Sequence, residues 1–271
     1  MLSQTINIGK IRLQTALIAV APKVPAPSVR TLFMEITVRY SAEIQLHPNL
    51  IPPILEFFVG RLGIHSVEPR VQFRAWYLFD RLLSKLQKNI AAISEQILST
   101  FTDLLVIRPP ETSEGAIETL DSDSEGESER DVFFDYQLYL FQSTGLLTAL
   151  SEKSNFQLPQ NIIRSLESSI GGRLEIGVLE HLDVLYVHHS IMAIGNVAKG
   201  FDGAAEIPYL TRQQHGARLF YPAAEMVLKA LSRCEDFAQI RDAVHFVMDE
   251  VDHSDTLYFF AICRSDGRDD S

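Results

Sequence analysis

Five basic side chains between residues 61 and 85 have the type and spacing of a surface that binds an anionic partner. Four of them, counted from Arg70, stand at offsets 0, 4, 11 and 15 (residues 70, 74, 81 and 85). Residues at these separations lie close to one side of an α-helix. Cations arranged in this way contact phosphate oxygens, and such contacts make binding strongly dependent on salt. The candidate binding residues are Arg61, Arg70, Arg74, Arg81 and Lys85.

These cations also have an interpretation that involves no ligand. They could be solvated ends of helical side chains, or they could form ion pairs across neighbouring repeats with Glu56 and Asp80. Exposed pairs of this kind contribute little to stability. The sequence alone leaves both interpretations open.

An acidic segment between residues 111 and 131 contains nine acids and one base, Arg130. Removing its net charge of −8 from the −11 of the chain leaves −3, so local basic surfaces remain compatible with the composition. We expect a disordered loop at 109–132. It is either an inert tether or a segment that repels a polyanion or docks a basic partner. The candidate regulatory residues are Asp121, Asp123, Glu125, Glu127 and Glu129.

No motif for catalysis or metal binding is present in the sequence. It contains no glycine-rich phosphate loop, no GxSxG, no HExxH and no paired-cysteine ligand set. His181, His188 and His189 are close in sequence, but no cysteine or carboxylate completes a metal site around them, so we interpret them as solvated or core residues. Trp76 and Tyr77 are likewise interpreted as core. We therefore predict a protein that is not an enzyme and has no cofactor, no metal and no small-molecule substrate.

The segment 50–87 must position the basic residues, and its pattern predicts two helices joined by a short turn. Pro52 and Pro53 suit the first turn of a helix, and Gly63 is expected to end it. Apolar residues of the second helix recur at helical spacing from Val71 to Leu86. Such a hairpin cannot bury its apolar faces alone, so neighbours must stack on both sides, as in HEAT or armadillo repeats.

The rest of the chain has the same helical periodicity and no regularly spaced strand pattern. We predict an all-α, HEAT-like solenoid over residues 1–271, a right-handed superhelix of antiparallel helix pairs. Two distant cysteines argue for a reducing compartment, and no apolar run is long enough to cross a bilayer. The further predicted helices are 6–20, 29–45, 89–106, 135–150, 160–177 (broken at Gly171-Gly172), 178–198, 217–231, 237–251 and 256–263, with a loop at 200–216.

The second helix of the hairpin resembles a repeat of the exportin-T family, the nuclear export receptors for transfer RNA. The resemblance rests on Glu68–Val71, Arg74–Phe79, Arg81–Leu82 and Lys85, preceded by Leu32–Tyr40 as in fungal members. Further similar segments follow in the same order: Phe101–Leu105, Pro109–Glu111, Gln137–Phe141 and Gly145–Leu147.

This resemblance implies a superhelix of the importin-β kind, of which the chain is an internal piece. It implies a receptor that binds tRNA and Ran-GTP cooperatively, passes nuclear pore proteins and shuttles between nucleus and cytoplasm without membrane insertion. The basic residues would then contact the RNA backbone. The alternative is a HEAT-repeat scaffold, or an importin or exportin for protein cargo, without RNA binding.

Overall fold

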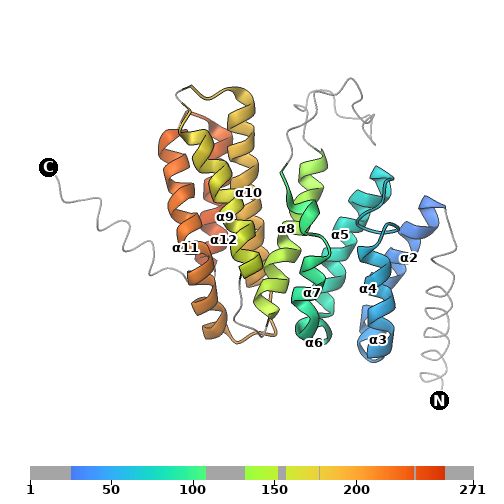
Figure 1. Ribbon diagram of the computed structural model, residues 1–271. Helices are drawn as coiled ribbons and strands as arrows, with labels where there is room; N and C mark the ends of the chain where they lie inside the picture. Colours follow the sequence, from blue (N-terminus) through green and yellow to red (C-terminus); the bar gives the residue numbers. More distant parts are fainter. Residues whose placement is uncertain (1–25, 108–131, 152–156, 177, 235, 254–271) are drawn as a thin grey trace, which may run out of the picture.

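The computed structural model describes residues 26–107, 132–151, 157–176, 178–234 and 236–253, and within these ranges every regular element is a helix. Figure 1 shows the helices following one another in chain order from α2 at one end to α11 and α12 at the other. The predicted all-α helical-repeat solenoid is confirmed. Within the same ranges, no helix is long and apolar enough to cross a membrane. The predicted helices 6–20 and 256–263 lie outside the described residues.

The helices divide into long elements and short, interrupted ones. The long helices are α2 (Pro27–Arg39), α5 (Pro69–Lys85), α8 (Val132–Leu150), α9 (Gln157–Leu174), α10 (His181–Asp202), α11 (Tyr209–Arg233) and α12 (Ala238–His253). The shorter ones are α3 (Ser41–Gln45), η2 (Pro48–Leu50), α4 (Ile51–Val59), α6 (Gln87–Ile90), η3 (Ala91–Ile93), α7 (Ser94–Ser99) and η4 (Thr102–Leu105).

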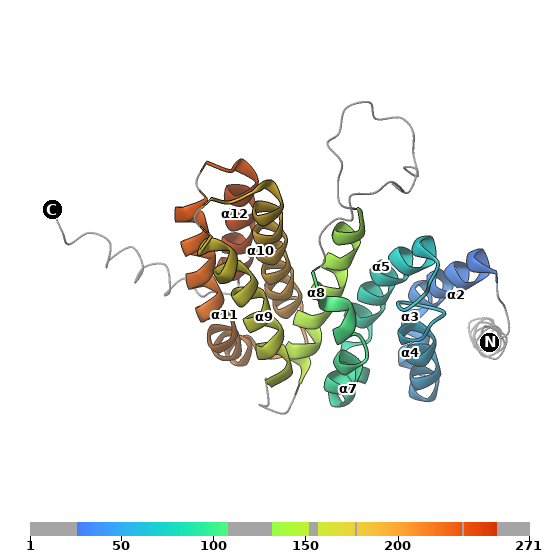
Figure 2. The same ribbon diagram turned by 45° about the horizontal axis from the view of Figure 1, so that its top comes forward.

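Five long helices form one layer, in which each contacts the next: α2, α5, α8, α10 and α12. The short helices α4 and α7, followed by α9 and α11, lie along one side of this layer (Figure 2). Phe79 of α5 shows the arrangement, because its ring contacts Phe58 of α4 at 6.2 Å and Phe101, at the start of η4, at 5.6 Å between centroids. The back of α5 is therefore buried, and its opposite side is left uncovered.

The hairpin α4–α5 is held closed by polar contacts within its turn. The amide of Ile64 donates to the carbonyl of Phe58 at 2.8 Å, and the Trp76 indole N–H donates to the carbonyl of Ile64 at 2.9 Å. Trp76 is 1% exposed, so the prediction that it belongs to the core is confirmed. The prediction that Gly63 ends α4 is wrong: the helix ends at Val59, with Gly60 as its C-cap.

Two glycines bring α8 and α10 into backbone contact. A Cβ on Gly145 would lie 1.9 Å from the carbonyl oxygen of Val197, and one on Gly200 would lie 1.8 Å from that of Gln142. No other residue fits at either position without moving the helices apart. The predicted loop at 200–216 is wrong at both ends. Gly200 is a packing residue inside α10, which the contact explains, and α11 already begins at Tyr209.

The segment 89–106, predicted as one helix, consists of the short elements α6, η3, α7 and η4. Ser99 Oγ and Thr100 Oγ1 donate to the carbonyls of Gln96 and Ile97 at 2.7 and 2.6 Å. Such local side-chain bonds compete with the helical backbone ladder and favour an interruption. The predicted helix 29–45 is similarly divided at Tyr40 into α2 and α3, and Ala26 occupies the N-cap of α2.

The prediction of a break at Gly171-Gly172 is wrong, because α9 continues through both residues to Leu174. Packing against α11 stabilises this part of the helix: a Cβ on Gly171 would meet the Cε of Met226 at 3.4 Å. Tertiary contact has overridden the low helix propensity of glycine.

Candidate nucleic-acid interface

Four of the five predicted cations lie on the uncovered side of α5. At about 100° per residue, offsets of 0, 4, 11 and 15 fall within roughly 60° of one another around the helix axis. All four side chains are exposed, and Phe79, which points to the opposite side, is fully buried. We call this set, Arg70, Arg74, Arg81 and Lys85, the α5 basic face.

The fifth cation, Arg61, is also exposed, but it lies in the turn after α4 and not on that helix as the sequence pattern suggested. The difference arises because α4 ends at Val59 and the chain then turns through residues 61–65. Arg61 therefore precedes the α5 basic face at the turn and does not extend it along a second helix.

Arg74 is the member of the face with a defined partner. Its Nη2 lies 2.8 Å from Glu35 Oε1 on α2, and its Nε donates to the same oxygen at 3.1 Å. Its guanidinium also lies 5.1 Å from the centroid of the Tyr77 ring. Both side chains of the ion pair are close to half-exposed, so solvent screens the pair and its contribution is small. The contacts hold the guanidinium in one orientation while leaving part of it accessible.

Arg70, Arg81 and Lys85 form no ion pair within the described part of the chain, so their charge is not neutralised by a contacting acid there. The pairing with Asp80 considered from the sequence does not occur as an exposed ion pair. Asp80 is 2% exposed and lies beneath the face toward α8. Glu56 likewise forms no ion pair among the described residues.

Asp80 is satisfied by α8. Gln142 Nε2 donates to its Oδ2 at 3.3 Å and Ser143 Oγ donates to its Oδ1 at 3.4 Å. Burial raises the pKa of Asp80 to about 6, against the lowering effects of the Ser143 hydrogen bond and of the positive charges of Arg81 and Lys199. The carboxylate is therefore largely ionised at neutral pH and offsets only part of the positive charge above it.

Aromatic side chains border the α5 basic face on its α8 side, and sequence reasoning did not assign them to it. The Tyr77 ring meets that of Tyr139 edge-on at 5.1 Å, and Tyr136 stacks on Phe73 at 5.3 Å. Tyr77, Tyr136 and Tyr139 are half-buried, so the prediction that Tyr77 belongs to the core holds only for part of its ring. Burial, together with its tyrosine neighbours, raises the pKa of Tyr139, which keeps its hydroxyl a neutral hydrogen-bond donor.

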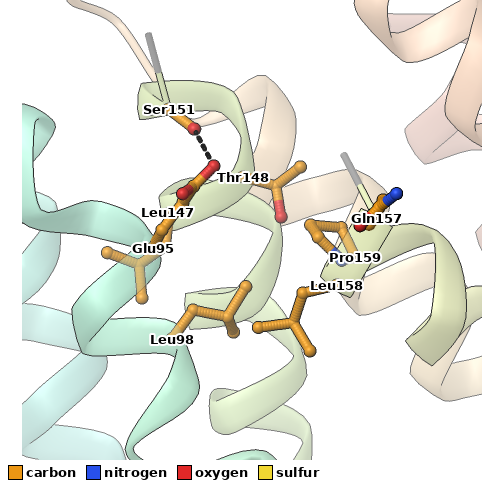
Figure 3. A pocket seen from close by; sticks show the side chains of 8 residues that line it. All are labelled: Glu95, Leu98, Leu147, Thr148, Ser151, Gln157, Leu158 and Pro159. Atoms are coloured by element: carbon orange, nitrogen blue, oxygen red, sulfur yellow. Dashed lines mark hydrogen bonds between the residues drawn. The ribbon is translucent and has the colours of Figure 1, made fainter. Parts of the chain in front are cut away.

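A cavity of about 240 Å³ lies away from this face, between α7, the end of α8 and the start of α9 (Figure 3). Its walls are mainly aliphatic, and its carboxylate, Glu95, accepts a hydrogen bond from Ser151 Oγ at 3.1 Å. The residues that line it are Glu95, Leu98, Leu147, Thr148, Ser151, Gln157, Leu158 and Pro159.

The histidines form no metal site in the described part of the chain, where no group of three metal-ligating side chains occurs. His189 is buried and stacks on Phe134 at 3.7 Å between ring centroids. Burial lowers its pKa to about 3, so it packs as a neutral ring. His181 is exposed, and His188 is half-buried. The acidic candidates Asp121, Asp123, Glu125, Glu127 and Glu129 lie outside the described residues.

Helices stacked in two layers, each packing against the next along the chain, define a helical-repeat protein. The sequence model of exportin-T matches residues 12–251. Among curated proteins, the chain is 33% identical over 230 residues to exportin-T of Phaeosphaeria nodorum and 31% identical over 228 residues to exportin-T of Aspergillus oryzae. The chain belongs to the exportin-T family. These alignments cover 82% and 81% of this chain and 22% of each relative, so the chain spans about a fifth of their length.

Proposed function

We propose that this chain is an RNA-binding part of a nuclear export receptor for tRNA and that the α5 basic face contacts the RNA backbone. The observation that carries the proposal is the placement of four exposed cations within one narrow strip of an uncovered helix, in a chain of the exportin-T family. Arginine and lysine side chains that neutralise phosphates supply affinity without reading sequence. Such contacts suit a cargo recognised by its shape and backbone.

The receptor as a whole would bind tRNA together with Ran-GTP, contact nuclear pore proteins and shuttle between nucleus and cytoplasm. In this proposal the protein transports its cargo and catalyses no reaction. These properties are proposed for a whole receptor, because the chain spans about a fifth of the length of its relatives. They are tested by capturing total RNA on a full-length version with and without Ran-GTP. Enrichment of tRNA that requires Ran-GTP supports the proposal.

Binding to the α5 basic face is tested with the 271-residue chain. Fluorescence anisotropy with labelled tRNA, repeated from about 50 to 200 mM salt, gives the slope of log affinity against log salt. We expect Arg70→Gln and Arg81→Gln each to weaken binding and to reduce the magnitude of the slope by about one. The matched controls are Arg218→Gln and Lys229→Gln on α11, exposed cations outside the layer that contains α5.

Equal binding by all four variants and the unchanged chain would contradict the proposal. Glu35→Gln provides a further test, because it releases Arg74 from its ion pair and removes one negative charge beside the face. It should strengthen RNA binding at low salt, and this gain should disappear at high salt.

A second function, a scaffold that binds basic proteins, is favoured by the acidic residues between 111 and 131. In that case the captured material would consist of basic proteins, and Ran-GTP would not enrich tRNA.

A further inference from the structure

The contact between α8 and α10 places a lysine of the second half of the chain beside the α5 basic face. At Gly200 the backbone of α10 meets the carbonyl of Gln142, and Gly145 of α8 meets the carbonyl of Val197. Because the two backbones touch, Lys199, the residue before Gly200, lies at the edge of α8 and not one side-chain layer away from it. Lys199 is exposed.

Asp80 gives an independent indication of the same proximity. Its carboxylate is acted on by the positive charges of both Arg81, its neighbour on α5, and Lys199, which reaches it from α10. The Gln142 amide, on the helix between them, donates to that carboxylate at 3.3 Å. Groups from three consecutive helices of the layer therefore act on one buried acid, and two of these groups are cations.

We propose that Lys199 and Arg81 form one phosphate-binding surface across α5, α8 and α10, and that Asp80 and Gln142 hold the three helices in the register that this surface requires. This inference rests on the proposed function and extends it, because it adds a binding residue from a helix outside the hairpin that the sequence pattern singled out. Helices packed side by side are about 8–10 Å apart. The glycine contacts bring α8 and α10 closer than this, so α5 and α10, with α8 between them, are separated by less than about 20 Å. A span of this size fits a polyanion with several phosphates.

The two cations of this surface, Arg81 and Lys199, are exposed, whereas Asp80, the acid that both act on, is buried. Lys199 forms no ion pair among the described residues, and the acid near it on α10, Asp202, lies 3.9 Å from Arg212. From α5 the surface receives Arg81 and the buried Asp80. The described part of α8 contributes Asp135, four residues before Tyr139, and no basic residue.

The test measures binding of labelled tRNA to the 271-residue chain in a salt series, for Lys199→Gln, Lys199→Arg, Arg81→Gln and the double variant Arg81→Gln/Lys199→Gln. We expect Lys199→Gln to weaken binding at 50 mM salt. It should also lower the magnitude of the slope of log affinity against log salt by about one, so that the loss of affinity between 50 and 200 mM becomes roughly three- to four-fold smaller. Lys199→Arg keeps the charge and should bind like the unchanged chain. Lys229→Gln is the matched control.

The outcomes separate this inference from the function on which it rests. If Arg81→Gln weakens binding and Lys199→Gln does not, the inference is wrong and the proposed function stands. If neither variant changes binding, or the chain binds no RNA, both fail. If Lys199→Gln weakens binding and Lys199→Arg fails to restore it while unfolding by urea is unchanged, a charge contact is excluded and the inference is overturned.

Discussion

The Asp80 carboxylate links α5 to α8 through hydrogen bonds, and its burial removes it from solvent. It is 2% exposed and accepts hydrogen bonds from Gln142 and Ser143, while burial raises its pKa to about 6. The unfolded chain releases this proton near pH 3.8, so between about pH 4 and 6 the folded state binds more protons than the unfolded state. The contribution of Asp80 to stability therefore falls as pH rises through this window.

Asp80→Asn should remove this pH dependence. A difference of about two pKa units corresponds to a cost of charge burial on the order of 3 kcal/mol. We expect the variant to gain stability relative to the unchanged chain as pH rises from 4 to 7, measured by urea unfolding at each pH. Asp236→Asn, at an exposed position, controls for the loss of one negative charge. A difference between Asp80→Asn and the unchanged chain that stays constant over this range would contradict the prediction.

Trp76 stabilises the fold through a single hydrogen bond, because its indole N–H closes the α4–α5 turn. Trp76→Phe removes the hydrogen bond to the Ile64 carbonyl and leaves a gap in a site that is 1% exposed. Losing such a bond to a buried group costs about 1–3 kcal/mol, which should appear as a lower urea midpoint. Tyr77→Phe, which keeps its ring contact with Tyr139, is the matched control and should change the midpoint little. Equal midpoints for both variants would show that the bond is not needed.

At the scale of elements, the join between α8 and α10 depends on glycine at two positions. A methyl group on Gly145 or Gly200 would lie less than 2 Å from a backbone oxygen, and backbone cannot rotate away as a flexible side chain can. We expect Gly145→Ala and Gly200→Ala each to cost about 1–3 kcal/mol or more, measured by thermal or urea unfolding.

Gly172 on α9 is the control for this prediction, since a Cβ there meets nothing within 4 Å. Gly172→Ala should stabilise the chain by about 0.5–1 kcal/mol through helix propensity alone. If Gly145→Ala were as stable as Gly172→Ala, α8 and α10 could not be in backbone contact.

The helix α5 could be predicted from the sequence because local signals agree: Pro69 opens it and apolar residues recur at helical spacing to Leu86. The positions of the four cations on one side of α5 follow from the same periodicity.

The division of residues 89–106 into short helices could not be predicted from the sequence. Ser99 and Thr100 donate hydrogen bonds to nearby carbonyls, and these bonds divide the segment. The prediction that Gly200 lies in a loop is wrong because the constraint that requires glycine there is contact with α8, a helix distant in sequence.

Lys199 was missed for the same reason. Nothing in its local sequence places it near Arg81, and only the packing of α10 against α8 does so. The residues of a surface that crosses three helices can be found from periodicity only on the helix where the cations repeat.

At the scale of the whole molecule, a chain of net charge −11 is proposed to bind a polyanion, and nine acids between residues 111 and 131 account for most of that charge. We propose that these acids oppose RNA binding electrostatically. The test neutralises the five candidates without changing length, in the variant Asp121→Asn, Asp123→Asn, Glu125→Gln, Glu127→Gln, Glu129→Gln, which brings the net charge from −11 to −6. Affinity for tRNA should rise at about 10 mM salt, where the Debye length is about 30 Å, and the gain should vanish near 1 M, where it is about 3 Å.

The control for this variant is Glu225→Gln with Asp236→Asn, exposed acids near α11 and α12, which reports how much any loss of negative charge helps. A gain per charge that is equal in both variants would mean that the acidic residues act only through net charge. Unchanged tRNA affinity together with lost binding of a basic protein would mean that these acids dock a protein partner, as the scaffold alternative requires. If the acidic segment acts near the bound RNA, the gain in tRNA affinity should be larger per charge for the five-residue variant than for the control. This gain should disappear at high salt, because screening removes long-range repulsion before it removes direct contacts.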